Sequence, residues 1–244
     1  MPQKRRPDYG IDAPGVIRNL ALAGAVLIAL AIWGPAKLKV GPLDLLTHAM
    51  FYWVGSVCFA EAILMLLYAK HGKFIHRDAM ISRLRWRGDE RVLDVGTGRG
   101  LLLIAAAKHL NAGGRASGID IWKTSDLSGN ARNRTEANLE IEGVGGRCEL
   151  REEDAQKMSF ANGSFDVVLS NLCLHNIASK RGRDEACRDI ARVLRPGGVA
   201  LISDFKNTAD YAAIFRSEGL AVKRSGPDIY NTFPPLRIVE ARKP

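Results

Sequence analysis

A carboxylate followed by three alternating glycines is the feature of this sequence that most directly suggests chemistry. The stretch RVLDVGTGRG places Asp94 before Gly96, Gly98 and Gly100. Glycine permits a tight turn and a close approach of ligand to main chain, and a following helix would direct its free N–H groups at that ligand. A carboxylate beside the turn suits a ligand that carries an ammonium group. The dinucleotide motif G-x-G-x-x-G is a poorer match, because Leu101 occupies the third small position.

Two further acids follow predicted strands, where they are suited to bind a nucleoside. Asp120 stands 20 residues after Gly100, at a strand end where a carboxylate can accept both hydroxyls of a ribose. The adjacent Ile121 offers apolar surface to an adenine ring. Asp154 and Ala155 follow the next strand, where a carboxylate can accept from an adenine amino group while the backbone N–H donates to the ring. Each acid alone is also compatible with an ordinary loop carboxylate.

A histidine close to the end of the next predicted strand is the best candidate for a general base. His175 lies four residues past Asn171, in SNLCLHNI. The ordinary pKa of histidine, about 6.5, suits proton transfer near neutral pH. The alternative for His175 is a packed or hydrogen-bonded structural role. The four cysteines form no C-x-x-C pair and have no metal-ligand spacing with histidine, so no metal site is predicted.

Four motifs in order over residues 91–244 give the sequence a family resemblance. They are the acid–glycine turn, Asp120, the Asp154–Ala155 pair followed by FDVVLSN, and RVLRPGG at residues 192–198. On these motifs the chain resembles the class I S-adenosylmethionine-dependent methyltransferases, in their small-molecule, type 11-like branch. The branch that methylates adenine or glutamine usually carries Asn/Asp-Pro-Pro-aromatic where this sequence has SNLC, which favours small molecules and lipids as substrates.

The resemblance implies S-adenosylmethionine as the cofactor and assigns roles to the residues above. Gly96, Gly98 and Gly100 would line its methionine and ribose, with Asp94 near the amino group, Asp120 at the ribose, Ile121, Asp154 and Ala155 at the adenine, and Asn171 beside the transferred methyl group. Methyl transfer is then an in-line displacement with a neutral thioether leaving, so alignment and desolvation can carry the catalysis. A base such as His175 matters only where the nucleophile begins protonated.

Alternating strands and helices must position these residues. Strands are expected at 91–95, 116–120, 147–151, 165–171, 199–204, 221–224 and 236–241, and helices at 101–110, 123–142, 183–194 and 209–218. The alternation predicts an α/β domain over residues 91–244, Rossmann-like and doubly wound, with a mostly parallel seven-stranded sheet and an antiparallel last strand. Ligands of such sheets bind at the carboxyl ends of the strands.

The chain before residue 91 has a different composition. We expect a flexible tail over residues 1–15, a transmembrane hairpin of two helices over 16–69 and a basic connecting helix over 70–90. The first apolar run, 19–34, is uncharged, and the second, 45–68, is interrupted by His48 and Glu61. A charge such as Glu61 within a span is either functional or reaches the headgroups. A cleaved signal peptide is the alternative for the first run, but a second apolar run follows almost at once.

Basic residues set the expected topology and partners. Lys4, Arg5 and Arg6 precede the first run and six basic residues follow the second, whereas the turn carries only Lys37 and Lys39. The positive-inside rule then places both termini and the catalytic domain in the cytoplasm, in a multi-pass protein of the cell membrane. Because the basic residues cluster beside the apolar runs, the net charge of +9 favours membrane lipids as partners. Nucleic acid is a less favoured partner, because no RNA-binding module is recognised.

The favoured interpretation is a membrane-anchored methyltransferase that acts on a lipophilic or membrane-associated small molecule, such as a lipid headgroup or a quinone precursor. One alternative is a methyltransferase for a soluble metabolite or a protein, with the hairpin serving only as an anchor. A second is a membrane assembly protein that binds the cofactor without turnover.

Overall fold

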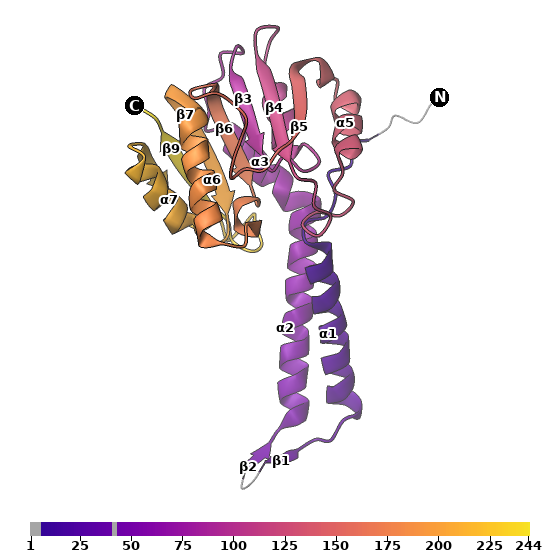
Figure 1. The fold of residues 1–244 in the computed structure, drawn as a ribbon. Helices are drawn as coiled ribbons and strands as arrows, with labels where there is room; N and C mark the ends of the chain where they lie inside the picture. Colours follow the sequence, from indigo (N-terminus) through magenta and orange to yellow (C-terminus); the bar gives the residue numbers. More distant parts are fainter. Residues whose placement is uncertain (1–5, 41–42) are drawn as a thin grey trace, which may run out of the picture.

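The computed structural model describes residues 6–40 and 43–244; Lys4 and Arg5 of the predicted basic cluster lie outside the described residues. A helical hairpin projects from an α/β domain (Figure 1). The elements are, in chain order, α1 (Pro14–Trp33), β1 (Leu38–Val40), β2 (Leu43–Leu45), α2 (Thr47–Leu67), the π-helix η1 (Tyr68–Gly72), α3 (Lys73–Ile81), β3 (Arg91–Val95), α4 (Leu101–Ala107), β4 (Arg115–Asp120), α5 (Arg132–Ile141), the 3-10 helix η2 (Gly145–Arg147), β5 (Cys148–Glu152), β6 (Phe165–Asn171), the 3-10 helix η3 (Leu174–Asn176), α6 (Lys180–Val193), β7 (Leu194–Asp204), α7 (Thr208–Ser217), β8 (Ala221–Arg224) and β9 (Arg237–Arg242).

Strands β3 to β9 form one sheet with the order β5-β4-β3-β6-β7-β9-β8. The first five of these strands are parallel, and β9 runs antiparallel to both β7 and β8. Strand β6 lies at the centre because its sequence, FDVVLSN, is buried at six of seven positions. The predicted α/β fold is confirmed. The strand order reverses between β3 and β6, so their carboxyl ends form the switch point where such sheets bind ligands.

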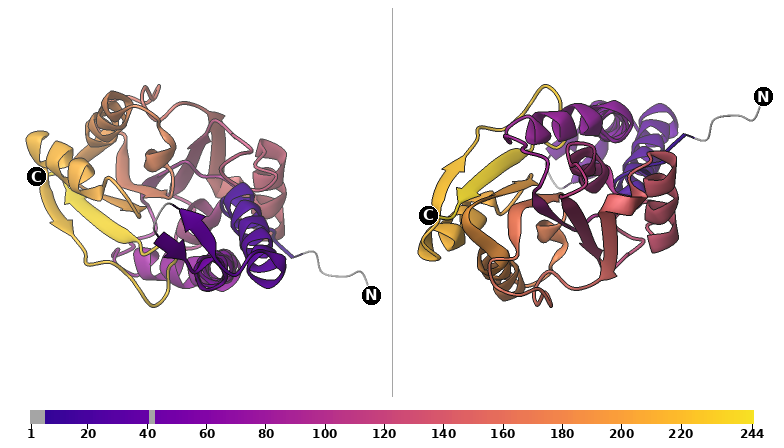
Figure 2. Two further views of the ribbon diagram at one scale, coloured as in Figure 1. Left: turned by 90° about the horizontal axis from the view of Figure 1, so that it is seen from below. Right: turned by 90° about the horizontal axis from the view of Figure 1, so that it is seen from above.

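Helices cover both faces of the sheet, as the end-on views show (Figure 2). One face packs against α3, α4 and α5 through a cluster that includes Met80, Leu103 and Leu139. The other face packs against α6 and α7 through Ile190 and Phe215, among others. Each helix presents one apolar stripe to the sheet, and burial of these stripes is the main stabilising contribution. The edge formed by the carboxyl ends of the strands lies between these two layers of helices.

Helices α1 and α2 pack antiparallel and leave the domain near the carboxyl edge of the sheet (Figure 1). Their close approach depends on Gly24 and Gly55, since a Cβ on Gly24 would lie 3.0 Å from the carbonyl oxygen of Gly55. Helix α1 and the helical run Thr47–Ile81, which begins with α2, each contain a stretch long and apolar enough to cross a membrane, with mean hydropathies of 2.1 and 1.8. Only 6% and 11% of those stretches are buried, unlike the core helix of a soluble domain.

The expectation of a flexible tail over residues 1–15 is wrong for residues 8–12, which form a strap across the domain. Tyr9 is 7% exposed, and its hydroxyl donates to Glu142 at 2.8 Å. The N–H of Asp8 donates to the side chain of Asn138 at 2.9 Å. The buried Arg99 pairs with the carboxylate of Asp8 at 2.5 Å. The strap is therefore held by residues more than 90 positions away, a contact that local composition does not reveal.

Two predicted helices are much shorter than expected, and α4 ends three residues before the predicted 110. The helix expected over 123–142 begins only at α5, because residues 123–131 turn with Gly129 at a φ of +54° and the Asn130 amide donates to the carbonyl oxygen of Lys123 at 3.3 Å. The connecting helix expected over 70–90 ends at Ile81. The residues after it run as turns and extended chain into β3.

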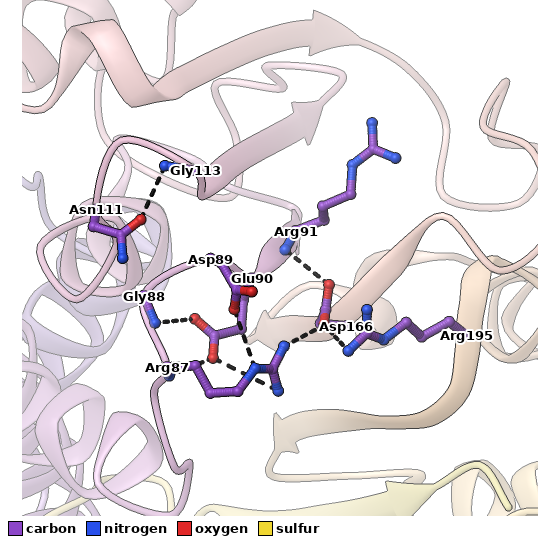
Figure 3. A network of polar contacts seen from close by, with 9 residues as sticks. All are labelled: Arg87, Gly88, Asp89, Glu90, Arg91, Asn111, Gly113, Asp166 and Arg195. Carbon is purple, nitrogen blue, oxygen red and sulfur yellow. Dashed lines mark hydrogen bonds and ion pairs between the residues drawn. The ribbon is translucent and has the colours of Figure 1, made fainter.

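A polar network at the amino edge of the sheet fixes the segment that joins α3 to β3 (Figure 3). Asp166, at the start of β6, accepts from the backbone N–H of Arg91 at 2.9 Å and from the guanidinium of Arg87 at 3.0 Å, and it also pairs with Arg195. Glu90 accepts from the N–H of Arg87 at 2.6 Å. Because the two carboxylates are buried, these partners are needed to offset their desolvation. The network lies opposite the edge from which the hairpin leaves.

Candidate functional site

The glycine turn predicted from the sequence forms the loop between β3 and α4. Gly96, Gly98 and Gly100 have φ angles of +73°, +53° and +85°, which residues with a side chain rarely adopt. The N–H groups of Gly96 and Thr97 donate to the carbonyl oxygen of Ile119 at 2.9 and 3.0 Å and so fix the loop against β4. The expected strand, turn and helix are present, and the backbone requires glycine at all three positions.

Asp94 is buried against this loop and supports it from within the domain. The residue is 2% exposed, and its Oδ2 accepts from Thr97 Oγ1 at 2.8 Å and from the N–H of Leu103 at 2.9 Å. Burial raises the pKa of Asp94 from an ordinary 3.8 to about 7. Both hydrogen bonds from the described residues go to Oδ2. The other oxygen is left for the predicted contact with an amino group, which stays a prediction.

Asp120 holds the same loop from the end of β4. Its carboxylate accepts from the N–H of Gly98 at 2.7 Å and from the N–H of Trp122 at 2.6 Å, and the Asn130 amide lies 3.4 Å away. Burial raises the pKa of Asp120 in spite of these donors. The structure thus brings together the glycine turn and the acid predicted for the ribose. A ribose would share this carboxylate with the loop amides.

Three other cofactor candidates lie after β4 and β5. Ile121 is 57% exposed, as expected of a residue that offers apolar surface to a ring. Ala155 is buried in the core. The Asp154 carboxylate is exposed and accepts from the backbone N–H of Gln156 at 2.9 Å and from its side-chain amide at 2.8 and 3.0 Å. These residues occupy the predicted edge, but no hydrogen bond among the described residues joins Asp154 to the glycine loop.

Asn171 ends β6 beside the glycine loop, and its Oδ1 is buried without a hydrogen-bond partner among the described residues. An orphaned buried acceptor is costly unless a ligand or water completes it. The loop after Asn171 packs closely on the turn, since a Cβ on Gly96 would lie 2.2 Å from Cys173 Sγ. Asn171 therefore presents an unused acceptor at the switch point of the sheet, where the sequence placed it.

His175 is positioned by a buried carboxylate that ends the neighbouring strand. Its Nδ1 lies 2.9 Å from Asp204 Oδ1, although the ring is turned so that this contact is not a well-aligned hydrogen bond. The backbone N–H of His175 donates to Asp204 Oδ2 at 3.1 Å, and the ring packs edge-to-face on Phe205 with 4.7 Å between centroids. Asp204 is fully buried. Such a pair can orient an imidazole as a base, as the triad logic of hydrolases illustrates.

Tyr68, the first residue of η1, was not among the site residues predicted from the sequence. Tyr68 is 5% exposed and its hydroxyl lies near the side chain of Asn171, but the two groups form no hydrogen bond of normal geometry. The carboxylates of Asp12 and Asp204 lie close enough to act on it electrostatically. A π-helical turn within a longer helix often marks a functional position. In the sequence, Tyr68 reads as the end of an apolar run, so only tertiary structure reveals its place.

The strap and α3 close the site on the side of the hairpin. Lys73 is 3% exposed and donates to the carbonyl oxygens of Tyr9 and Gly10 at 2.9 and 2.6 Å and to Asp12 at 3.3 Å. One turn on, His76 Nε2 lies 2.6 Å from Ser203 Oγ, next to Asp204. The helix that leaves the hairpin is thus tied both to the strap and to the end of β7.

These residues fit a nucleoside that carries a cationic amino acid. The carboxylates of Asp94 and Asp120 offer acceptors to ammonium and hydroxyl groups along one edge. Three glycines leave the intervening loop free of side chains. S-adenosylmethionine has this chemistry, so the residues present fit the expected cofactor.

Comparison with known proteins identifies a methyltransferase domain in this chain. Residues 93–202 match a family model described as a methyltransferase domain. The curated relatives include the ubiquinone/menaquinone biosynthesis C-methyltransferase UbiE of Vibrio campbellii, 29% identical over 119 residues, and that of Pseudomonas putida, 34% identical over 119 residues. The match covers 49% of this chain and 42% and 43% of those proteins. The chain thus matches less than half the length of these relatives.

Solved structures share the fold at low sequence identity. A SAM-dependent methyltransferase from Aquifex aeolicus is 17% identical, with a TM-score of 0.54 over 68% of this chain and 88% of that one. The [4+2]-cyclase SpnF is 16% identical, with a TM-score of 0.58 over 96% of this chain and 99% of that one. At these identities the likeness concerns the fold alone.

Proposed function

We propose that this chain is a membrane-anchored, class I S-adenosylmethionine-dependent methyltransferase that acts on a lipophilic or membrane-associated small molecule. The observation that carries this proposal is the continuity of α2 with η1. The last turn of the apolar helix leads directly to Tyr68, whose hydroxyl faces Asn171 at the end of β6. An apolar helix that contributes a residue to the site connects the hairpin to the chemistry more directly than an anchor joined by a flexible linker would.

The hairpin meets the site at both of its ends. Asp12, which Lys73 binds, lies two residues before α1, and Tyr68 directly follows α2. If α1 and α2 cross the bilayer, the site lies at its surface, within reach of a molecule whose tail stays in the lipid. At about 1.5 Å per residue, the 20 residues of α1 span about 30 Å, the thickness of the hydrocarbon core. The expected orientation, with both termini and the domain in the cytoplasm, keeps the site beside the cytosolic cofactor.

Each group of site residues has its own role in the proposed methyl transfer. When bound, S-adenosylmethionine supplies an activated methyl group. Asp94, Asp120 and the glycine loop hold and orient that group's carrier, with Ile121, Asp154 and Ala155 toward its adenine. Tyr68 and Asn171 bind a polar atom of the acceptor, and His175, held by Asp204, removes the acceptor's proton where it has one.

The curated relatives favour one substrate class within this proposal. Their names describe C-methylation in quinone biosynthesis. A hydroxylated ring with an isoprenoid tail would place an ionisable O–H at the site and its tail in the bilayer, which suits a histidine base beside a membrane helix. We therefore propose a quinone precursor as the first substrate to test, with lipid headgroups and other lipophilic metabolites next.

Two alternatives are separated by experiment. A methyltransferase for soluble metabolites or proteins would use the hairpin as an anchor only, and a cofactor-binding assembly protein would show no turnover. The fold by itself does not require methyl transfer, because the structurally similar SpnF is described as a cyclase.

The test uses the full chain reconstituted in vesicles with methyl-labelled S-adenosylmethionine. A prenylated hydroquinone that lacks one ring methyl group is offered with a long tail, and the same ring with a short tail is offered in solution. We expect label in the long-tailed product at a rate at least tenfold above that for the short-tailed one. Equal rates would favour the soluble-substrate alternative, and bound cofactor without label from either probe or from a cell extract would favour the non-catalytic one.

A matched pair of variants tests the role of Tyr68. Tyr68→Phe removes only the hydroxyl, and Tyr52→Phe makes the same change at a residue of α2 that is 59% exposed. Loss of one hydrogen bond to the acceptor should raise the KM for the long-tailed probe about three- to tenfold in the first variant. The second should behave as the parent. Equal behaviour of the two variants would remove Tyr68 from the site.

A further inference from the structure

Loops at the carboxyl edge of the sheet expose apolar and basic side chains around the point where the hairpin leaves. Phe205 and Lys206 directly follow β7, Ile229 and Tyr230 lie between β8 and β9, and Lys123 follows β4. We call these five residues the rim. Ile229 is 61% and Tyr230 91% exposed, values unusual for large apolar side chains of a folded domain.

The rim is placed beside the hairpin by a direct contact. A Cβ on Gly72, the last residue of η1, would lie 2.3 Å from the carbonyl oxygen of Asn231. The loop that carries Ile229 and Tyr230 is therefore pressed against the helix as it leaves the hairpin. Gly72 lies five residues past Leu67, the last residue of α2, which is 52% exposed. That is about 7.5 Å along a helix, comparable with the depth of one headgroup layer.

The Ile229–Tyr230 loop has a fixed shape. Asp228 accepts from the N–H groups of Tyr230 and Asn231 at 3.2 and 3.0 Å. Thr232 donates its hydroxyl to the carbonyl oxygen of Asp228 at 2.6 Å and accepts from the N–H of Leu236 at 2.8 Å. The loop thus holds two apolar side chains outward while its own polar groups are satisfied. Burial of these side chains in a partner would cost little conformational entropy.

The composition of the rim matches a bilayer surface better than a protein partner. Tyrosine and phenylalanine suit the interface between headgroups and hydrocarbon, and lysine can extend its charge to anionic headgroups while its stem lies on apolar surface. Lys206 lies 5.3 Å from the centroid of the Phe205 ring, so a cation and an aromatic ring stand together. Lys70 and His71 of η1 are also exposed near the hairpin exit.

We propose that the rim is a second, peripheral contact of the domain with an anionic bilayer, which seats the carboxyl edge of the sheet on the headgroup layer. This inference rests on the membrane-anchored function proposed above. The hairpin supplies the anchor, and the rim sets the orientation of the domain on it. With the rim seated, the end of β7 and the Tyr68 side of the site face the lipid, so an acceptor enters without crossing water.

The test measures which positions of the full chain touch lipid. Cysteines introduced as Tyr230→Cys, Ile141→Cys and Leu22→Cys are labelled with bimane in separate variants, and the chain is reconstituted in vesicles of phosphatidylcholine and phosphatidylglycerol that contain nitroxide-labelled lipid. Ile141 is an exposed apolar residue at the end of α5, on the amino-edge side of the domain, and serves as the control. Leu22, 59% exposed on α1, reports on the hairpin. The parent chain, treated identically, gives the background from its native cysteines.

We expect a headgroup nitroxide to quench the label at position 230 at least threefold more than the label at 141. An acyl-chain nitroxide should quench the label at 22. Charge reversal by Lys206→Glu, or vesicles of phosphatidylcholine alone, should halve the quenching at 230 while leaving position 22 unchanged. Quenching at 22 with equal quenching at 230 and 141 would overturn the rim proposal alone. No quenching at 22 would overturn the membrane anchor, and with it the proposed function.

Discussion

The buried carboxyl group of Asp94 leads to a sharp prediction about cofactor binding. Its pKa of about 7 means that the group is about half ionised at pH 7, about one-eleventh ionised at pH 6 and about one-hundredth at pH 5. If the ionised form binds the amino group of S-adenosylmethionine, the dissociation constant should rise about fivefold from pH 7 to pH 6 and about ninefold more to pH 5. The ligand's own amino group stays protonated over this range.

The assay is equilibrium binding of S-adenosylmethionine to the full chain in detergent at these three pH values. Asp94→Asn is the matched variant, because an amide oxygen can still accept from both Thr97 and Leu103. We expect it to bind about tenfold more weakly than the parent at pH 7 and to lose most of the pH dependence. A parent affinity that stays constant from pH 7 to pH 5 would refute the reasoning and leave Asp94 as a support of the loop only.

The raised pKa of Asp94 also determines how the stability of the fold depends on pH. The folded-state pKa of Asp94 lies above the ordinary value of 3.8, so the folded state holds the proton more tightly than the unfolded state. The stability associated with this proton is fully present below pH 3.8 and is lost as the pH rises through about 7. The unfolding temperature of Asp94→Asn, relative to that of the parent, should therefore rise as the pH rises from 4 to 7. An acid held by a salt bridge would give the opposite trend.

Three other predictions follow from the geometry. Asp204→Asn should lower turnover of a protonated acceptor about 100-fold, as His175→Ala should, while binding of S-adenosylmethionine stays within about twofold; full turnover in either would place the base elsewhere. Gly24→Leu should overfill the contact between α1 and α2 and cost about 1–3 kcal/mol, read as a lower unfolding temperature in detergent, and an unchanged temperature would refute the close packing. His76→Ala should leave the hydroxyl of Ser203 without its partner, at a cost of about 1–3 kcal/mol of stability. The readout is the rate of proteolysis near α3, and a rate equal to that of the parent would contradict the prediction.

Local patterns in the sequence were enough to predict the sheet and the glycine turn. Strand β6 centres on the apolar residues 167–169, and the turn places glycine at each of its three positions of positive φ, so both are visible in the local sequence. The prediction of a helix over 123–142 was wrong for a local reason as well. The turn signal in Ser128-Gly129-Asn130 outweighs a composition that otherwise suits a helix. Asn130 is used there to hold the loop rather than to extend α5.

The strap and the α3 contacts were beyond prediction because they join residues far apart in the chain. Lys73 meets Asp12 across 61 positions, and His76 meets Ser203 across 127. A lysine among basic residues reads as a solvated or membrane-facing charge, and nothing in its neighbourhood indicates burial. Tyr68 was hidden in a similar way, because it stands at the end of an apolar run whose last turn packs into the domain.

These contacts show that residue 91, where the family resemblance begins, is not a structural boundary. Tyr68, Lys73 and His76 lie on one continuous helical run and touch the end of β6, the strap and the end of β7 in turn. Met80, farther along the same run, is fully buried in the core of the domain. The hairpin and the candidate site therefore share one continuous helical run, so we expect a displacement of the hairpin to be transmitted to Tyr68 and the end of β6. An anchor joined by a flexible linker would transmit no such displacement.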